Sequence, residues 1–224
     1  MTTSARVIDK NTWGRAPHYD HFNQRDFPYV GFCAEVELTN SFYYAKTHSI
    51  SIFNLVSYAV LAAANDIREF RLRAHGDEIV EYESLRFGFV AMTKEPPLFS
   101  FGEVEKGESF NEFNDLIESE KSRISQEIML ETKLESDDVI YTSCLPWLRF
   151  TSFVHPVNLN IPSTIPLISW GKIIDKDGYV DMPVSVQANH ALMDGWHISM
   201  YYKKLQQYLA EPEKLLEEML YPLG

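Results

Sequence analysis

Hydrophobic and polar segments are most clearly separated in the last third of the chain. Residues 165–174 and 179–188 are mostly apolar, and the second run leads into a turn, so we expect two strands there. Asp175-Lys176-Asp177-Gly178, between them, has the composition of a tight hairpin turn. After Gly195, apolar residues return at helical spacing, which predicts a helix. His190 is thereby expected on a loop between a strand and a helix, a place that often carries function.

Shorter apolar runs indicate further strands over residues 27–38, 78–82, 87–92 and 139–144. Gly31 is expected to form a bulge in the first of these strands. His75-Gly76-Asp77 supplies a turn before the second strand, and Pro96-Pro97 interrupts regular structure after the third. The segment from Asn11 to Phe22 is polar and aromatic.

Two helices are expected in the first two thirds of the chain. Residues 49–67 are apolar on several faces and rich in alanine, which is typical of a largely buried helix. A second helix begins at Ser109, because Glu112 follows three residues later in a capping-box pattern. Its apolar residues lie on one side: Phe110, Phe113, Ile117, Ile124 and Ile128. A charged loop is expected over residues 131–138.

Because strands and helices interleave, we expect an α/β fold, a two-layer mixed β-sheet with covering helices. The chain has 224 residues, of which 45% are hydrophobic, and this suits a sizeable core. No repeat or linker divides it. Residues 1–224 are therefore expected to form a single domain, in which 212–224 is a short C-terminal tail.

Charge and cysteine content restrict the class of protein. The net charge of −12 argues against a nucleic-acid partner, whose phosphates need a basic face. Cys33 and Cys144 give no disulfide framework, which favours a reducing compartment. The longest apolar run, over residues 55–64, is too short to span a bilayer, and residues 1–6 lack the apolar core of a signal peptide. We expect a cytoplasmic protein without a membrane partner.

The strongest candidate for chemistry is the pattern His190-x-x-x-Asp194-Gly195. Taken alone, these residues equally suit an ordinary polar turn. The sequence contains no glycine-rich phosphate loop and no Gly-x-Ser-x-Gly motif, so neither a nucleotide site nor a triad hydrolase is indicated. His18 and His21 could share one helix face, but no third ligand accompanies them, and we expect no metal site.

Four sequence blocks accompany this pattern, and their order and separation are as informative as their residues. They are Trp13-Gly14-Arg15, Glu69-Phe70-Arg71 with Gly76-Asp77-Glu78, Thr142–Trp147 with Phe150–Phe153, and Gln187–Gly195. In these blocks the chain resembles chloramphenicol acetyltransferases over roughly residues 8–210. The resemblance implies an acetyltransferase with acetyl-CoA as co-substrate and no metal. It also implies a homotrimer whose active sites lie at the subunit interfaces, and chloramphenicol as the small-molecule acceptor.

The same resemblance implies roles for four residues. His190 falls on the general base, which suits an imidazole because its unperturbed pKa of about 6.5 leaves much of it neutral at cytoplasmic pH. Ser143 falls on the serine that donates to the oxyanion, although a serine bonded to the backbone of a strand is the alternative. Asp194 and Arg15 fall on an ion pair that braces the loop of the base and supports the site.

An acceptor pocket is implied at Phe22, Tyr29, Phe32, Phe99, Phe101 and Ser169. Of these, Phe22, Tyr29 and Phe32 are expected to face His190 from the neighbouring chain. Two departures give the pocket a larger and drier wall: Phe22 stands where a tyrosine is usual, and Phe101 where a small residue is common.

Cofactor-binding residues are implied at Trp147, Lys172 and Phe53. Trp147 and Lys172 fall on the CoA channel, although Trp147 equally suits the core. Phe53 could stack on adenine. Ser51 replaces a lysine that often contacts the nucleotide end of CoA. Two alternatives stay open: the same chemistry on another alcohol or amine, and a catalytically weak binding homologue.

Overall fold

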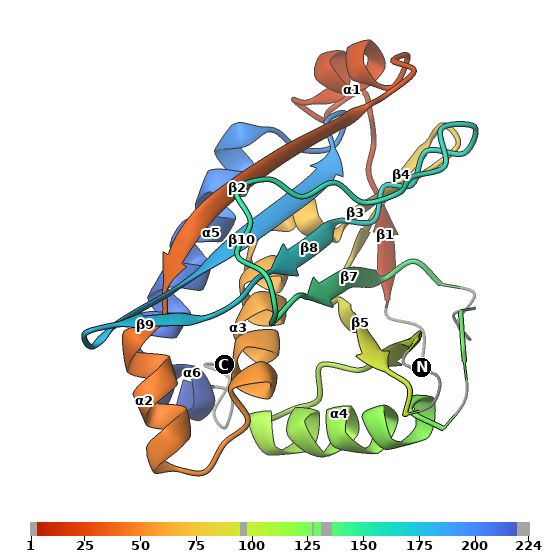
Figure 1. Ribbon diagram of the computed structural model, residues 1–224. Helices are drawn as coiled ribbons and strands as arrows, with labels where there is room; N and C mark the ends of the chain where they lie inside the picture. The colour runs from red at the N-terminus through yellow and green to blue at the C-terminus, as the bar shows by residue number, and fades with distance from the viewer. Residues whose placement is uncertain (1–3, 95–97, 127, 131–135, 219–224) are drawn as a thin grey trace.

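The computed structural model describes residues 4–94, 98–126, 128–130 and 136–218. A seven-stranded mixed sheet runs through these residues in the order β2-β10-β8-β7-β5-β6, with β9 paired to the start of β10 (Figure 1). The strands are β2 Tyr29–Glu37, β5 Arg86–Met92, β6 Phe99–Val104, β7 Val139–Cys144, β8 Leu167–Trp170, β9 Ile174–Lys176 and β10 Tyr179–Asn189. The pairs β5–β7 and β7–β8 are parallel and the others antiparallel.

Helices form a second layer against this sheet. The α-helices are α1 Ala16–Phe22, α2 Thr39–Thr47, α3 Ile52–Asp66, α4 Phe110–Ile124, α5 Gly195–Ala210 and α6 Pro212–Glu218. Helices α3 and α5 pack on each other, α5 lies against β2, and α4 lies against β6 (Figure 1). The fold is therefore the expected α/β arrangement of a mixed sheet with covering helices.

A smaller sheet stands beside the large one, in the order β1-β4-β3. Its strands are β1 Ala5–Val7, β3 Leu72–His75 and β4 Glu78–Tyr82, and the 3₁₀ turn η1 Arg68–Arg71 leads into β3. Gly76 has a φ of 64° in the turn between β3 and β4, a conformation that favours glycine. No helix of the described residues is long and apolar enough to cross a membrane.

The core lies between the two layers and explains why the central elements could be predicted. In β10 every residue after Tyr179 is buried, and in α3 every residue from Asn54 to Ala64 is buried. Helix α3 begins at Ile52, three residues later than expected. Ser51 is extended there and accepts a hydrogen bond from the backbone N of Asn54, which makes it the N-cap.

Two expectations about the large sheet are wrong. Gly31 forms no bulge, because β2 pairs one to one with β10 from Tyr29 opposite Asn189 to Glu37 opposite Asp181. The strand expected over residues 165–174 is divided into β8 and β9. Pro183 has no N–H to donate, and the β10–β8 ladder ends at the neighbouring pair, Val184 with Trp170.

Other elements differ in extent. The helix capped by Ser109 ends at Ile124, so Ile128 lies beyond it and is 49% exposed. Helices α1 and α2 and strands β1, β3 and β6 had no clear pattern in the sequence. The strands at 78–82 and 139–144 and the helix after position 195 are confirmed, as is the hairpin turn, where Asp177 and Gly178 have φ angles of 53° and 91°. Pro96-Pro97, residues 131–135 of the charged loop and the tail beyond residue 218 lie outside the described residues.

Candidate active site

Arg15 holds the loop that carries His190. It lies at the N-terminus of α1 and donates three hydrogen bonds to the loop between β10 and α5. Nη2 donates to the backbone oxygen of His190 at 2.9 Å, Nε to that of Ala191 at 3.1 Å, and Nη1 to Asp194 Oδ2 at 2.5 Å. The implied pair of Arg15 and Asp194 is therefore present, and the same guanidinium also fixes the backbone beside the histidine.

Asp194 has a second structural task as the N-cap of α5. Its Oδ1 accepts a hydrogen bond from the backbone N of Trp196 at 3.0 Å and lies 2.9 Å from Nδ1 of His197. Burial raises the pKa of Asp194, but the hydrogen bond from Arg15 and the charges of His197 and Arg15 outweigh it and lower the pKa to about 2. Asp194 is therefore ionised at neutral pH and serves as an anchor.

This low pKa predicts a pH-dependent contribution to stability. Because the folded pKa of Asp194 lies below its unfolded value, the stabilisation is fully present above pH ~4 and is lost as the pH falls towards 2. We expect the difference in unfolding free energy between the wild type and Asp194→Asn to shrink by about 2 kcal/mol over that window. Denaturant unfolding at pH 7, 4 and 2.5 measures it. A difference that stays constant would contradict the ion pair.

His190 follows the last residue of β10 and is held by three contacts. Its backbone N donates to the oxygen of Pro28 at 2.8 Å, and its ring stacks on Phe22 with centroids 3.9 Å apart. Nδ1 lies 3.0 Å from the backbone oxygen of Met193. Because a carbonyl oxygen only accepts, this contact places the proton of the neutral imidazole on Nδ1. Nε2 is then left with a free lone pair, which is the state that a general base needs.

The stacked ring corrects one expectation. Phe22 was expected to face His190 from a neighbouring chain, but it lies against the His190 of its own chain. Both rings belong to elements that Arg15 joins, since α1 carries Phe22 and the loop after β10 carries His190. Phe22 is thus placed to hold the orientation of the imidazole.

Ser143 lies on β7 and opens into a cavity of about 350 Å³. Among the described residues its hydroxyl has no hydrogen-bond partner, so the alternative of a serine bonded to the strand backbone does not hold. The lining residues are Val90, Phe99, Phe101, Tyr141, Thr142, Ser143, Phe153, His155, Pro156 and Leu167. The rings of Phe99 and Phe101 lie 5.7 Å apart. The structure therefore brings Ser143 together with two of the six implied acceptor-binding residues.

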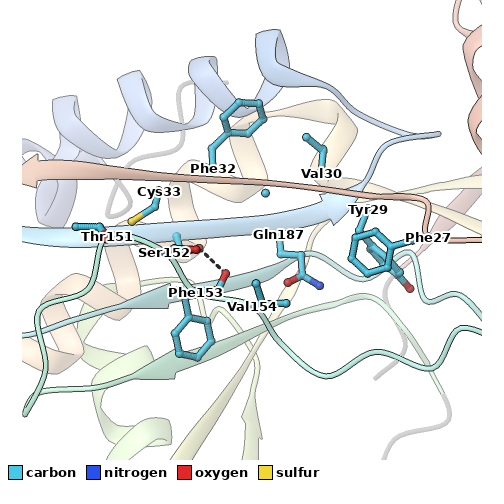
Figure 2. Close-up of a pocket in the computed structure, with 12 residues that line it drawn as sticks. Phe27, Tyr29, Val30, Phe32, Cys33, Thr151, Ser152, Phe153, Val154 and Gln187 are labelled. Atoms are coloured by element: carbon cyan, nitrogen blue, oxygen red, sulfur yellow. Dashed lines mark hydrogen bonds between the residues drawn. The ribbon is translucent and has the colours of Figure 1, made fainter.

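Tyr29 and Phe32 line a different cavity of about 310 Å³, over β2 and β10. Figure 2 shows residues 151–154 running alongside these strands. Phe153 lines both cavities, so the two adjoin. The ring of Phe32 also lies close to Gly195. A Cβ at this position would lie 3.3 Å from that ring, whereas the backbone of Gly195 needs no left-handed conformation.

His155 is a polar residue of the first cavity that the sequence did not single out. Its Nε2 lies 2.9 Å from Oγ of Ser169, and burial lowers its pKa to about 4. Ser169 itself is fully buried behind His155 and is no part of the cavity wall. One signal was available, since His155 stands two residues after the Phe150–Phe153 block.

The implied cofactor residues are separated in the structure. Trp147 is 72% exposed, so the alternative of a core position is wrong. Lys172 is exposed beside the same turn, where its backbone N donates to the oxygen of Leu148 at 2.8 Å. Phe53 is half-buried, 5.8 Å from Trp170, and Nζ of Lys121 lies 4.4 Å from its ring centroid. The described residues contain no group of three His, Cys, Asp or Glu that could hold a metal ion.

His190 and Ser143 do not meet within one chain. Ser143 pairs with Ser169, and Ser169 with Ser185, across β7, β8 and β10. His190 lies five residues beyond Ser185, which is ~16 Å along a strand, and the two strand spacings add ~10 Å sideways. The two side chains together span less than ~10 Å. If His190 is the base and Ser143 the oxyanion donor of one reaction, the two residues would therefore have to come from two chains.

The chain is similar to known proteins in both sequence and fold. The chloramphenicol acetyltransferase family matches residues 4–206. A chloramphenicol acetyltransferase of Clostridium butyricum is 26% identical over 94% of this chain and 97% of its own length. A solved chloramphenicol acetyltransferase has a TM-score of 0.81 at 27% identity, covering 92% of this chain and 100% of that one. A dihydrolipoamide acetyltransferase of Azotobacter vinelandii shares the fold, with a TM-score of 0.67 at 14% identity over 90% of this chain and 88% of that one. The chain therefore belongs to the chloramphenicol acetyltransferase family and is an acyltransferase.

Proposed function

We propose that this chain transfers an acetyl group from acetyl-CoA to a hydroxyl of chloramphenicol, with His190 as general base and Ser143 as oxyanion donor. One observation carries the proposal. The bond of His190 Nδ1 to the Met193 oxygen leaves Nε2 unprotonated, on a ring that Phe22 holds in place. Family membership supplies the reaction class.

In this mechanism Nε2 of His190 takes the proton of the acceptor hydroxyl as its oxygen attacks the thioester carbonyl. The imidazolium that forms keeps its Nδ1–H bond to Met193, so the ring does not have to reorient. The hydroxyl of Ser143 donates to the carbonyl oxygen on which negative charge develops. The proton on Nε2 then passes to the departing thiolate. Asp194 takes no part in proton transfer, because Arg15 holds its carboxylate.

The distance between His190 and Ser143 supports a composite site, in which the base of one subunit acts in the Ser143 cavity of the next. Such a pairing repeats around a closed ring, and we propose a homotrimer. Apolar side chains around the second cavity are unusually exposed, with Phe27 at 52% and Val154 at 70%. Nε2 of Gln187 is buried there without a partner among the described residues. The exposed apolar side chains favour burial of this face against a second copy of the chain.

Residues at the end of β7 fit the acetyl-CoA side of the reaction. Trp147 follows Ser143 by four residues and is exposed, as is Lys172, which lies beside the same turn. An exposed indole and an ammonium suit the pantetheine arm and the phosphates of CoA respectively. Phe53 is less suited to adenine, since core side chains and Lys121 surround its ring. We propose a cytoplasmic enzyme that needs no metal.

Thiol release from acetyl-CoA in the presence of chloramphenicol tests the proposed function. We expect acceptor-dependent release, with the acetylated hydroxyl identified by mass spectrometry and NMR. The control omits chloramphenicol. Release that does not depend on chloramphenicol, but does depend on another alcohol or an amine, would contradict the proposed acceptor and keep the chemistry. Absence of release with every acceptor would contradict the function.

Ser143→Ala is expected to lower kcat by ~10²–10³-fold with little change in KM, since an oxyanion donor acts where charge develops. Steady-state kinetics with chloramphenicol measures both constants. Ser122→Ala is the matched control, because Ser122 is exposed on α4, away from the cavity. Equal losses in KM and kcat would point to a packing role for Ser143.

A further inference from the structure

His155 brings a second polar side chain into the cavity that Ser143 lines. Its backbone N donates to Oε1 of Gln187 at 3.0 Å, and the ring of Phe153 meets its imidazole edge-on at 4.7 Å. These contacts, with the bond to Ser169, fix the imidazole against the wall of the cavity. Its neighbours along the wall are mainly aromatic and aliphatic, Phe99, Phe101 and Leu167 among them.

Only one of the two ring nitrogens is engaged by the protein. Nε2 is bonded to Ser169, whereas Nδ1 has no hydrogen-bond partner among the described residues. Burial keeps the ring neutral at physiological pH, with a pKa of about 4. Nδ1 is not fully buried, so a ligand in the mainly apolar cavity can reach it and replace water as its hydrogen-bond partner.

We propose that Nδ1 of His155 hydrogen-bonds a second polar group of the acceptor and thereby determines which alcohols are acetylated. This inference rests on the proposed function, because it assigns the acceptor to the Ser143 cavity. His155 is here a specificity-determining residue, distinct from the base at His190.

The spacing of the strands sets where that second group lies in the acceptor. Ser143 and Ser169 are register partners on the parallel strands β7 and β8, which lie ~4.8 Å apart. His155 is bonded directly to Ser169, so its imidazole is roughly one strand spacing from the Ser143 hydroxyl. The second polar group is therefore expected on the part of the acceptor that lies nearest the acetylated hydroxyl.

The hydrogen bond between His155 and Ser169 determines which chemical groups of the acceptor can bind Nδ1. When the Ser169 hydroxyl donates to Nε2, the proton of the imidazole lies on Nδ1, which then donates to the acceptor. When Nε2 donates to Ser169, Nδ1 accepts instead. Either state suits a hydroxyl or an amide, and neither supplies a charge for a carboxylate or an ammonium group. The structure thus assigns a neutral acceptor with an aromatic body, which packs on Phe99 and Phe101.

Three substitutions separate recognition from a structural role. His155→Asn places an amide atom near the position of Nδ1 but does not reach Ser169. His155→Gln reaches towards Ser169 but leaves the Nδ1 position empty, and His155→Leu removes both polar atoms at similar volume. The probes are chloramphenicol and its analogue without the hydroxyl that is not acetylated. Chloramphenicol also carries an amide, so an analogue without the amide group is the second comparison.

The expected result is a change in KM with little change in kcat. His155→Leu and His155→Gln should raise KM for chloramphenicol about 10-fold, and the preference over one of the two analogues should fall by a similar factor. His155→Asn should retain most of that preference. Rescue by glutamine and not by asparagine would overturn the proposal, because it would assign His155 to the support of Ser169. An unchanged preference in all three variants would overturn it as well.

Equilibrium binding of the same compounds, followed by calorimetry, gives a readout that does not depend on turnover. If the wild type binds chloramphenicol with the same His155 dependence but does not acetylate it, the proposed function fails and the recognition role stands. If acetylation proceeds at full rate and His155→Leu discriminates between the analogues as the wild type does, the recognition role fails and the function stands.

Discussion

Alanine at position 190 is expected to lower kcat/KM for acetyl transfer by ~10²–10⁴-fold and to leave the fold intact. The imidazole makes one side-chain hydrogen bond, to Met193, and one stacking contact, to Phe22, so its loss removes little packing. The backbone of the loop stays tied to Arg15 and Pro28. Steady-state kinetics and the melting temperature, measured on the same preparations, test both halves of the expectation.

His18→Ala is the matched control, because His18 is exposed on α1, the helix that also carries Phe22. It should retain wild-type kinetics. Near-wild-type turnover in His190→Ala would remove this residue from the role of base. A large fall in melting temperature would instead assign His190 to the support of the loop.

The second large effect is expected at the pair formed by Arg15 and Asp194. Asp194→Asn keeps a side chain that can cap α5 but removes the charge opposite Arg15, which is largely buried. We expect a loss of about 2–4 kcal/mol in unfolding free energy, below the value for a fully buried pair because Asp194 is partly exposed. Activity should fall with it, since the loop of His190 loses its brace.

Arg15→Val should be more damaging than Asp194→Asn, because Arg15 also donates to the backbone oxygens of His190 and Ala191. The double variant should be less damaged than the sum of the two single variants, by about 1–3 kcal/mol. Denaturant unfolding and kcat, measured for all four proteins of the cycle, test this. Strictly additive effects would contradict the pair, and a loss of activity without a loss of stability would favour a relay role for Asp194.

How far the sequence predicts the fold depends on how deeply each element is buried. Strand β10 and helix α3 are buried over most of their length, so their long apolar runs predict them. Helix α1 buries only Tyr19. The position of α1 is determined by Arg15, whose hydrogen-bond partners lie about 175 residues further along the chain. The hydrophobic periodicity of a short segment cannot reveal such a long-range contact. Strand β8 ends next to Pro183 of β10, which has no N–H to donate. The end of β8 could not be predicted from its own residues, because it depends on which strand pairs with it.

The candidate site shows the same limit. Residues in sequence motifs, such as His190 and Ser143, could be proposed from the chain alone. The tautomer of His190 could not, because it depends on where the Met193 oxygen points. The only local signal for His155 was its place two residues after the Phe150–Phe153 block, and its bond to Ser169 forms only after two segments come together in the fold. Phe22 was expected to face His190 from a neighbouring chain, and its contact with His190 of its own chain could not be predicted from the spacing of residues.

Complementation between two inactive variants tests the composite site most directly. His190→Ala chains keep Ser143, and Ser143→Ala chains keep His190, so in the proposed homotrimer a mixed assembly contains one site with both residues. After unfolding and refolding of an equal mixture, we predict about one quarter of the wild-type activity, because roughly three quarters of random trimers are mixed and each has one intact site of three. Activity that stays at the level of the separate variants would contradict an active site built from His190 of one chain and Ser143 of another.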